Sequence, residues 1–262
     1  MDASLLYAME VECVGVVARI ALNGIDVLSD WEGARRREVL DVNPYVIEGS
    51  NHLEVFLTPM TDDAGRVVGR QHALRVRLYR LTRGRPLDEG ERLAQFAWSE
   101  KVIPVAPGVM TGVWARQFTV APERAFGRWS WQDAAPPSGD DDALELVALA
   151  EIIHGALSRK DADAVLDLTA LRDQELARAK GVTFDEQRGE QRSILRGWFG
   201  SPWWALDPFD PTALAATPFV KGRVVRVTDP LGGAPIKGTD GVRRFTFGFM
   251  AARVEGSWTI VR

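Results

Sequence analysis

Residues 248–262, GFMAARVEGSWTIVR, decide most of the fold that this sequence predicts. They have the pattern of a strand, a tight turn at Glu255-Gly256 and a return strand that ends on Arg262. Glycine supplies the left-handed backbone that such a turn needs. A long stretch of helical pattern precedes this hairpin. The second half of the chain is therefore expected to be α+β, with helices first and strands after them.

The first half has the pattern of strands throughout. In residues 5–23, apolar side chains such as Val16, Ala18 and Ile20 alternate with other positions, and this period of two predicts a half-buried strand. Asn23-Gly24 then provides a turn that closes a hairpin. Short strands separated by turn-forming residues predict an all-β antiparallel sandwich. The further strands are expected at 39–42, 52–57, 73–81, 93–102 and 112–120.

Residues 121–142 interrupt this rhythm with prolines, glycines and three consecutive aspartates at 140–142. Proline, glycine and clustered like charge oppose regular packed structure, so the domain boundary is expected near 135–142. The predicted domains are a β-sandwich over 1–135 and an α+β domain over 143–262. The aspartates stand directly before an apolar run, where acidic side chains favour the N-terminus of a helix.

Three helices are expected in the second domain, the first two within 143–180. Asp161 is positioned to cap the second helix, which should end near Gly181. Thr183 and Glu186 have the spacing of a capping box for a third helix that runs to about residue 199. The buried side chains of the first helix are expected to be Leu144, Val147, Ala150, Ile153 and Leu157. The later strands are expected at 219–228, 234–237, 242–253 and 257–261.

The composition fits a globular protein and carries few functional signals. Of 262 residues, 46% are hydrophobic and 26% are charged, and the formal net charge of −4 gives no general attraction to nucleic acid or to anionic membranes. The single Cys13 excludes a disulfide within the chain and a multi-cysteine metal site. No cofactor, metal site, catalytic residue set or nucleic-acid partner is therefore predicted.

The sequence also bears on the compartment. No apolar run approaches the ~20 residues that cross a bilayer as a helix, so no transmembrane segment is predicted. Residues 1–13 lack the basic start and the uninterrupted apolar core of a signal peptide. A cytoplasmic location is expected, or a periplasmic one if a leader has been removed. The sequence predicts no particular oligomeric state.

Two short motifs in the first half carry a resemblance. Leu22-Asn23-Gly24 forms a tight turn, and Gly49-Ser50-Asn51-His52-Leu53-Glu54-Val55 has a sharp entry into a strand. This part of the chain, residues 18–57, resembles the galactose-binding-like β-sandwich (jelly-roll) domains that accompany glycoside hydrolases. The resemblance concerns turns and core positions, so it implies a fold and does not by itself imply sugar binding.

The second half is similar to the NTF2-like (cystatin-related) α+β superfamily. Its terminal strand, Gly256-Ser257-Trp258-Thr259-Ile260-Val261-Arg262, has a form that is frequent in that superfamily. The resemblance implies about three helices packed on a curved antiparallel sheet, with a cavity between them. Some relatives perform proton-transfer or hydrolytic chemistry in that cavity. The order of helices and strands supports this resemblance more strongly than the residues of the short motif do.

Polar candidates for such a cavity are few. All three tyrosines lie in the first half, so a tyrosine-based oxyanion hole is excluded from the second. The polar candidates of the second half are His154, Asp207, Asp210 and Asp229. His154 follows two isoleucines on the first helix, where it either points into the cavity or packs as a partly buried histidine. Asp207 and Asp210 each precede a proline, a position that is typical of turns and caps.

The aromatic side chains are densest at residues 198–209. They either fill the open end of the cone or line a pocket for an apolar ligand or a partner protein. The leading hypothesis is a non-enzymatic two-domain binding or protein-interaction protein; a bacterial accessory or immunity protein of a secretion system would fit. The residues predicted to bind the ligand or partner are Trp198, Phe199, Trp203, Trp204, Asp207, Phe209 and His154.

Two other hypotheses stand beside this one. A small enzyme would use the cavity for acid/base chemistry, with His154 and an aspartate as the acid and the base. A carbohydrate-binding accessory module would instead use exposed rings of the first domain. Trp31, beside Asp30 and Glu32, has the best position for such a ring. Trp98 and Trp114 fall in predicted strands and are expected to point inward.

Overall fold

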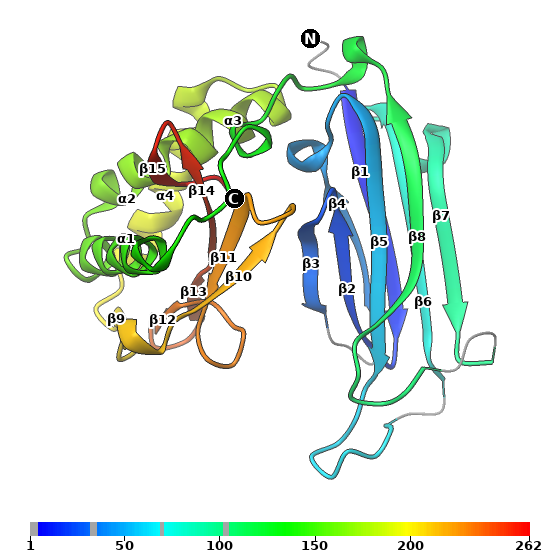
Figure 1. Ribbon diagram of the computed structural model, residues 1–262, viewed down its shortest axis with the longest axis horizontal. Coiled ribbons are helices and arrows are strands. Elements are labelled where there is room, and N and C mark those ends of the chain that lie inside the picture. Colours follow the sequence, from blue (N-terminus) through cyan, green and yellow to red (C-terminus); the bar gives the residue numbers. More distant parts are fainter. Residues whose placement is uncertain (1–4, 32–35, 69–70, 102–104) are drawn as a thin grey trace. The chain divides into compact units, whose positions relative to one another are not determined.

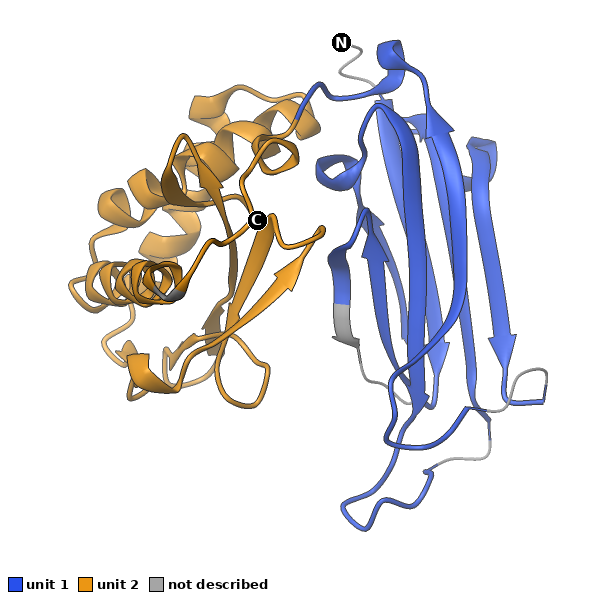
Figure 2. Ribbon diagram, in the orientation of Figure 1, with its two compact units in different colours: residues 1–128 blue, residues 129–262 orange. Residues whose placement is uncertain are grey.

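The computed structural model describes residues 5–31, 36–68, 71–101 and 105–262. The chain divides into two compact units, Met1–Arg128 and Trp129–Arg262 (Figure 2). Antiparallel sheets make up the first unit, and the second contains helices and further antiparallel strands (Figure 1). The sequence analysis predicted this order of elements, and the structure confirms it.

The first unit contains two four-stranded antiparallel sheets, and a central strand of each buries every second residue: Leu74, Val76 and Leu78 in one, and Leu53, Val55 and Leu57 in the other. Alternate burial on both sheets is the pattern of a β-sandwich. In one sheet the order is β4 (Arg36–Asp41), β1 (Leu5–Val14), β6 (Ala73–Thr82) and β7 (Glu91–Ser99). In the other it is β3 (Ile25–Trp31), β2 (Val16–Leu22), β5 (Gly49–Pro59) and β8 (Thr111–Val120).

Gly15 divides the single strand that was predicted over residues 5–23. It has φ 62°, and the strands on its two sides, β1 and β2, belong to different sheets. The alternation also changes phase there, because Val11 and Cys13 are buried before it and Val16 and Ala18 after it. A Cβ at Gly15 would lie 2.6 Å from the carbonyl oxygen of Gln71. This position therefore needs glycine both for its backbone angle and for space.

The outer face of β1 holds a buried carboxylate, Glu10, which is 2% exposed. Arg37 on β4 donates to it at 2.5 and 2.8 Å, and Arg77 on β6 also donates to it. Burial alone would raise the pKa of Glu10, but the hydrogen bonds from the two guanidinium groups outweigh it and hold the pKa below its ordinary value. The three strands are thus joined by charged side chains as well as by backbone pairing.

In the second unit, the described residues form four α-helices where three were predicted. The second predicted helix is interrupted at Thr169, whose hydroxyl lies within hydrogen-bonding distance of the carbonyl oxygens of Val165 and Leu166 and of the Asp173 carboxylate, the last at 2.9 Å. The predicted caps at Asp161 and Gly181 and the capping box of Thr183 and Glu186 are confirmed. The helices are α1 (Asp140–Ser158), α2 (Ala162–Leu168), α3 (Ala170–Lys180) and α4 (Phe184–Phe199).

The buried face of α1 is the predicted one at Ala150, Ile153 and Leu157, and it differs at the start of the helix. Leu144 was expected in the core but is 68% exposed, whereas Leu146 and Leu149 are buried with Ile153 and Leu157. The helix is apolar on two faces, so a run of residues three and four apart can be traced along either of them. Only packing against the sheets decides which face is buried.

The helices lie on one side of two antiparallel sheets (Figure 1). One sheet has the order β10 (Ala215–Phe219), β11 (Val224–Thr228), β14 (Phe249–Val254) and β15 (Ser257–Ile260). The other has the order β13 (Arg244–Phe247), β12 (Ile236–Thr239) and β9 (Ala205–Leu206). The strand predicted over 242–253 is thus two strands in different sheets, separated at Gly248. Phe245, Phe247 and Phe249 nevertheless all contact the same core.

The predicted hairpin at 248–262 is confirmed, with a turn at Glu255 and Gly256, both of which have positive φ. Buried Asp142, in the first turn of α1, joins this hairpin to the helix. Its carboxylate accepts hydrogen bonds from the indole N–H of Trp258 at 3.0 Å and from Arg253 at 2.7 Å. It also accepts the backbone N–H of Ser138 at 2.5 Å. One side chain therefore anchors the start of the helix to the last two strands.

Asp142→Asn is expected to lower the thermal unfolding midpoint at neutral pH. The N–H of Ser138 is the largest influence on the pKa of Asp142 and lowers it; burial acts in the opposite direction, and Trp258 and Arg253 add to the lowering. A depressed pKa gives stability that is present above the ordinary value of 3.8 and is lost as the pH falls through the folded-state value. The difference in unfolding midpoint between the variant and the unaltered protein should therefore become smaller below about pH 4.

The control is Asp141→Asn, which changes an exposed aspartate in the same helical turn. Thermal unfolding of both variants and the unaltered chain between pH 3 and 7 makes the comparison. Equal midpoints for the two variants at pH 7, or a deficit of Asp142→Asn that does not depend on pH, would contradict the assignment of Asp142 as the anchor.

Candidate functional site

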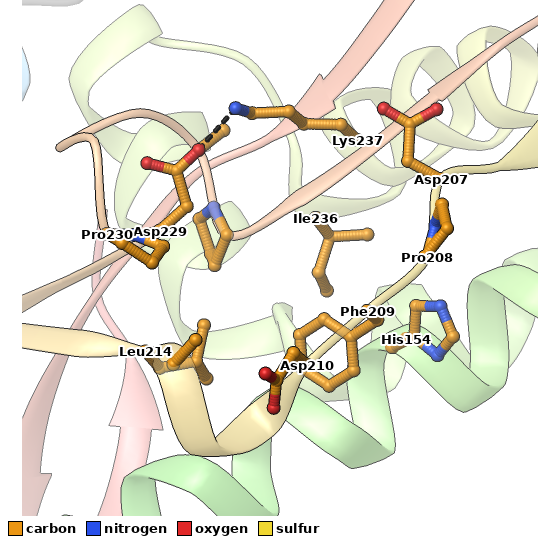
Figure 3. Close-up of a pocket in the computed structure, with 13 residues that line it drawn as sticks. His154, Asp207, Pro208, Phe209, Asp210, Leu214, Asp229, Pro230, Ile236 and Lys237 are labelled. Atoms are coloured by element: carbon orange, nitrogen blue, oxygen red, sulfur yellow. Dashed lines mark hydrogen bonds and ion pairs between the residues drawn. The ribbon is translucent and has the colours of Figure 1, made fainter.

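A pocket of about 290 Å³ opens in the second unit between α1, the segment that follows β9, and the connection from β11 to β12 (Figure 3). An adjoining depression of about 420 Å³ shares four of its lining residues and continues towards Lys160 and Trp204. The four shared residues are His154, Asp207, Pro208 and Phe209. All four polar candidates of the sequence analysis, His154, Asp207, Asp210 and Asp229, line the first pocket.

His154 is placed on α1 so that its ring stacks on Phe209, with ring centroids 4.6 Å apart and planes 13° apart. No side chain or backbone group in the described part of the chain forms a hydrogen bond with its ring nitrogens. Burial lowers the pKa of His154 below the ordinary value of 6.5. At neutral pH the ring is therefore uncharged and offers one N–H donor and one acceptor nitrogen to a ligand.

Each of the three aspartates already has a local partner. Asp229 accepts the backbone N–H groups of Leu231 and Gly233 at 2.9 and 2.8 Å and forms an ion pair with Lys237. The hydrogen bond from Lys237 is the largest influence that lowers the pKa of Asp229. These bonds hold the loop after β11 in place, so Asp229 shapes the wall of the pocket.

Asp210 and Asp207 are also engaged. Asp210 accepts both the hydroxyl and the backbone N–H of Thr212, at 2.7 and 2.9 Å, and these bonds lower its pKa. Asp207 forms an ion pair with Arg244 at 2.7 Å. Figure 3 shows the carboxylates of Asp207, Asp210 and Asp229 at separate positions around the pocket, none of them against another. The three carboxylates therefore do not converge on one point.

The rest of the lining is mainly apolar. A pocket with an apolar floor and a few polar groups at its rim is the usual form of a small-molecule site. In Figure 3, Ile236 is drawn in the middle of the view, above the ring of Phe209, and Pro208 and Pro230 stand at opposite sides. The apolar lining residues are Pro208, Phe209, Ala213, Leu214, Pro230, Ala234, Pro235 and Ile236.

The aromatic residues that were predicted to bind occupy three different environments. Trp198, Phe199 and Trp204 pack into the core around Phe245, where the ring of Trp204 lies 5.3 Å from Phe199 and 4.8 Å from Phe245. Phe209 forms the stack with His154 at the pocket. Trp203 is 72% exposed. The structure thus brings together His154, Asp207 and Phe209, while Trp204 touches only the adjoining depression.

Trp203 lies against the tip of the hairpin formed by β12 and β13. A Cβ at Gly241 would lie 2.8 Å from the Cβ of Trp203, so only glycine lets the tip approach this closely. The N–H of Arg243 is the largest influence on Asp240 at this tip, and its pKa is lowered to about 2. The exposed indole therefore stands beside a rigidly bonded turn.

Most of the apolar lining residues of the pocket, and the charged Lys237, were not among the sequence candidates. Lys237 follows Asp229 across Pro230-Leu231-Gly232-Gly233, a turn-forming segment that reverses the chain. This turn could have indicated from the sequence that Lys237 lies near Asp229, because a chain reversal brings the residues on its two sides together. Of the sugar-binding candidates in the first unit, Glu32 and the side chains of Asp30 and Trp31 lie outside the described residues.

No protein-family model, curated protein or solved structure that was compared with this chain matches it. Within the described ranges, no helix has the length and apolar character needed to cross a membrane. The same residues contain no group of three or more histidine, cysteine or acidic side chains arranged to hold a metal ion. Function must therefore be argued from the pocket itself.

Trp204→Ala is expected to reduce the free energy of unfolding by about 2–4 kcal/mol, somewhat below the ~3–5 kcal/mol of a fully buried ring because Trp204 is only partly buried. Trp203→Ala should change it by at most about 0.5 kcal/mol, as exposed positions do. Urea denaturation of both variants measures the difference. Similar losses for the two would mean that the packing assigned to Trp204 is wrong.

His154 is expected to titrate below pH 6.5, because burial disfavours its charged form. The pH dependence of its ring proton resonances in NMR measures the midpoint. His154→Gln assigns the signal, since the chain has only three histidines. A midpoint at or above 6.5 would show that the ring is solvated or faces a carboxylate, contrary to the stacked geometry.

Proposed function

We propose that this protein is a non-enzymatic, two-domain binding protein that takes a small, mostly apolar ligand in the His154 pocket. The observation that carries the proposal is the stacked pair of His154 and Phe209, whose imidazole has no hydrogen-bond partner in the described part of the chain. An unoccupied donor and acceptor beside an apolar floor suits a ligand with a ring and one polar group.

We also propose the finer fold assignments that the element order suggests. The first unit would be a galactose-binding-like jelly roll, and the second an NTF2-like cone in which helices cover a curved sheet. In the second unit the helices come before the strands along the chain and lie on one side of the sheets, which supports the second assignment (Figure 1). The pocket between α1 and the connection from β11 to β12 would then correspond to the cavity of the cone.

The charges at the rim favour binding over catalysis. Asp229 is neutralised by Lys237 and Asp207 by Arg244, and Asp210 caps its own turn. A general base needs a free lone pair within hydrogen-bond reach of its substrate, and a second group usually orients it. No carboxylate of the residues that the structure describes lies within hydrogen-bond distance of His154 to orient it. The site resembles a receptor pocket more than an acid/base pair.

Size restricts the ligand. At about 290 Å³ the pocket is at the lower end of the ~300–1,000 Å³ range of small-molecule sites. A peptide would need a longer groove, so the pocket itself favours a compact ligand. Of the three aspartates at the rim, only Asp210 lacks a cationic partner among the described residues. Its negative charge is not neutralised, so the pocket should prefer neutral and cationic ligands to anions.

Three probes of similar shape test this: indole, benzylamine and benzoate. We expect indole and benzylamine to bind with dissociation constants on the order of 1 mM, as small fragments do, and benzoate to bind more weakly. Binding is followed through the NMR shift of the His154 ring protons. Phe209→Ala should weaken indole binding several-fold because it removes the stacking surface.

Two variants act as controls. Phe219→Ala removes a half-buried ring elsewhere in the second unit, on β10, and should leave binding unchanged. Ala213→Trp fills the pocket and should abolish binding without removing any core side chain. If none of the probes moves the His154 signal, or if Ala213→Trp binds them as the unaltered protein does, the proposed function is wrong.

One observation favours a second candidate, a small enzyme that uses His154 for acid/base chemistry: His154, Asp207 and Asp210 line the same pocket. The ester p-nitrophenyl acetate is a general probe for such activity. Hydrolysis by the unaltered protein that is lost in His154→Gln would support the enzyme and count against a purely binding role. A role in a secretion system and a cytoplasmic location stay predictions of the sequence.

A further inference from the structure

A second pocket, far from His154 in sequence, lies in the first unit between β7 and β8. These are edge strands of the two different sheets, and they contact each other. The pocket between them has a volume of about 280 Å³, and we call it the edge pocket. It is lined by residues 92–95 of β7 and 114–116 of β8.

Two arginines stand in the edge pocket, Arg92 from one sheet and Arg116 from the other. Neither forms an ion pair with any described residue. Every other described arginine within a strand of this unit has a carboxylate within 4 Å, so the two exceptions meet at one site. Those paired arginines are Arg19, Arg36, Arg37, Arg75, Arg77 and Arg80.

The position of Arg116 is unusual for a charged side chain. Along β8 it falls between Trp114 and Phe118 at two-residue steps, so it shares the face that is buried further along the strand. The ring of Trp114 stacks on Phe96 of β7, with centroids 5.3 Å apart and planes 28° apart. The indole thus closes the inner side of the pocket next to a guanidinium without an acidic partner.

We propose that the edge pocket binds the oxyanion of a small organic ligand, a carboxylate or a phosphate, between Arg92 and Arg116. A guanidinium presents a planar fork of N–H donors that matches these oxyanions in a bidentate way. Two such groups from opposite walls can hold one anion, and Trp114 provides an apolar surface for the group that carries it. The preferred charge is opposite to that expected at the His154 pocket.

The probes are benzoate and phenyl phosphate, with neutral benzamide as the isosteric control. Binding to the full chain is followed by NMR through the Nε–Hε signals of the arginine side chains, assigned with Arg92→Ala and Arg116→Ala. We expect at least one oxyanion to shift both signals and benzamide to shift neither. The affinity should fall as salt is added, because both charges are partly exposed.

Each alanine substitution should weaken binding about tenfold or more, as the loss of a charged hydrogen bond does. Arg116→Lys keeps the charge but loses the fork, so it should restore only part of the affinity. Arg85→Ala, which removes an exposed arginine paired with Glu89, is the matched control and should change nothing.

The two oxyanions distinguish the source of the ligand: stronger binding of benzoate indicates a carboxylic acid, and stronger binding of phenyl phosphate a phosphate ester. Equal binding of benzamide, or unchanged affinity in the double variant of Arg92 and Arg116, would overturn the proposal. So would a lack of any shift at 10 mM probe, about tenfold above the dissociation constants expected of fragments. The arginines would then serve only to keep edge strands from pairing with other chains.

Discussion

The carboxylate of Asp142 is the contact on which the second unit depends most. It sits in the first turn of α1, and through Trp258 and Arg253 it ties that turn to both strands of the terminal hairpin. The position of α1 determines where His154 lies, about two turns of helix beyond the buried Leu146. A surface cap could hold a helix end in place only weakly; a buried acceptor with several donors holds it in one orientation.

Features coded by a few neighbouring residues were predictable from the sequence. The caps at Asp161 and Gly181, the capping box at Thr183 and the turn at Glu255-Gly256 each depend on local hydrogen bonds or backbone angles. The interruptions at Gly15, Thr169 and Gly248 were not predictable in this way. At Thr169 and Gly248 the periodic pattern continues, and at Gly15 it only changes phase. The pairing of strands or the packing of helices far away in the chain shows that the element has ended.

The candidate site was also predictable only in part: its residues could be chosen from the sequence, but their charge states could not. Residue type and position in the sequence selected His154 and three aspartates, and the fold places all four around one pocket. Their states depend on partners that residue type does not reveal: Lys237 and Arg244 neutralise two aspartates, and Phe209 covers the imidazole. Fixed charges and an uncharged ring support the proposed binding role, because they leave little free charge to drive a reaction.

The crossing at Gly15 has a kinetic consequence. Because β1 and β2 enter different sheets at that residue, β1 cannot pair with its neighbour in sequence. It pairs with β4 and β6 instead, and Glu10 is 27 positions from its partner Arg37 and 67 positions from its partner Arg77. Closing so long a loop before any contact rewards it makes folding slow, commonly milliseconds to seconds for sandwiches. The helices of the other unit, whose neighbours adjoin in the chain, should form much earlier. We therefore expect the helices of the second unit to form before the sheets of the first unit, although the first unit is synthesised earlier.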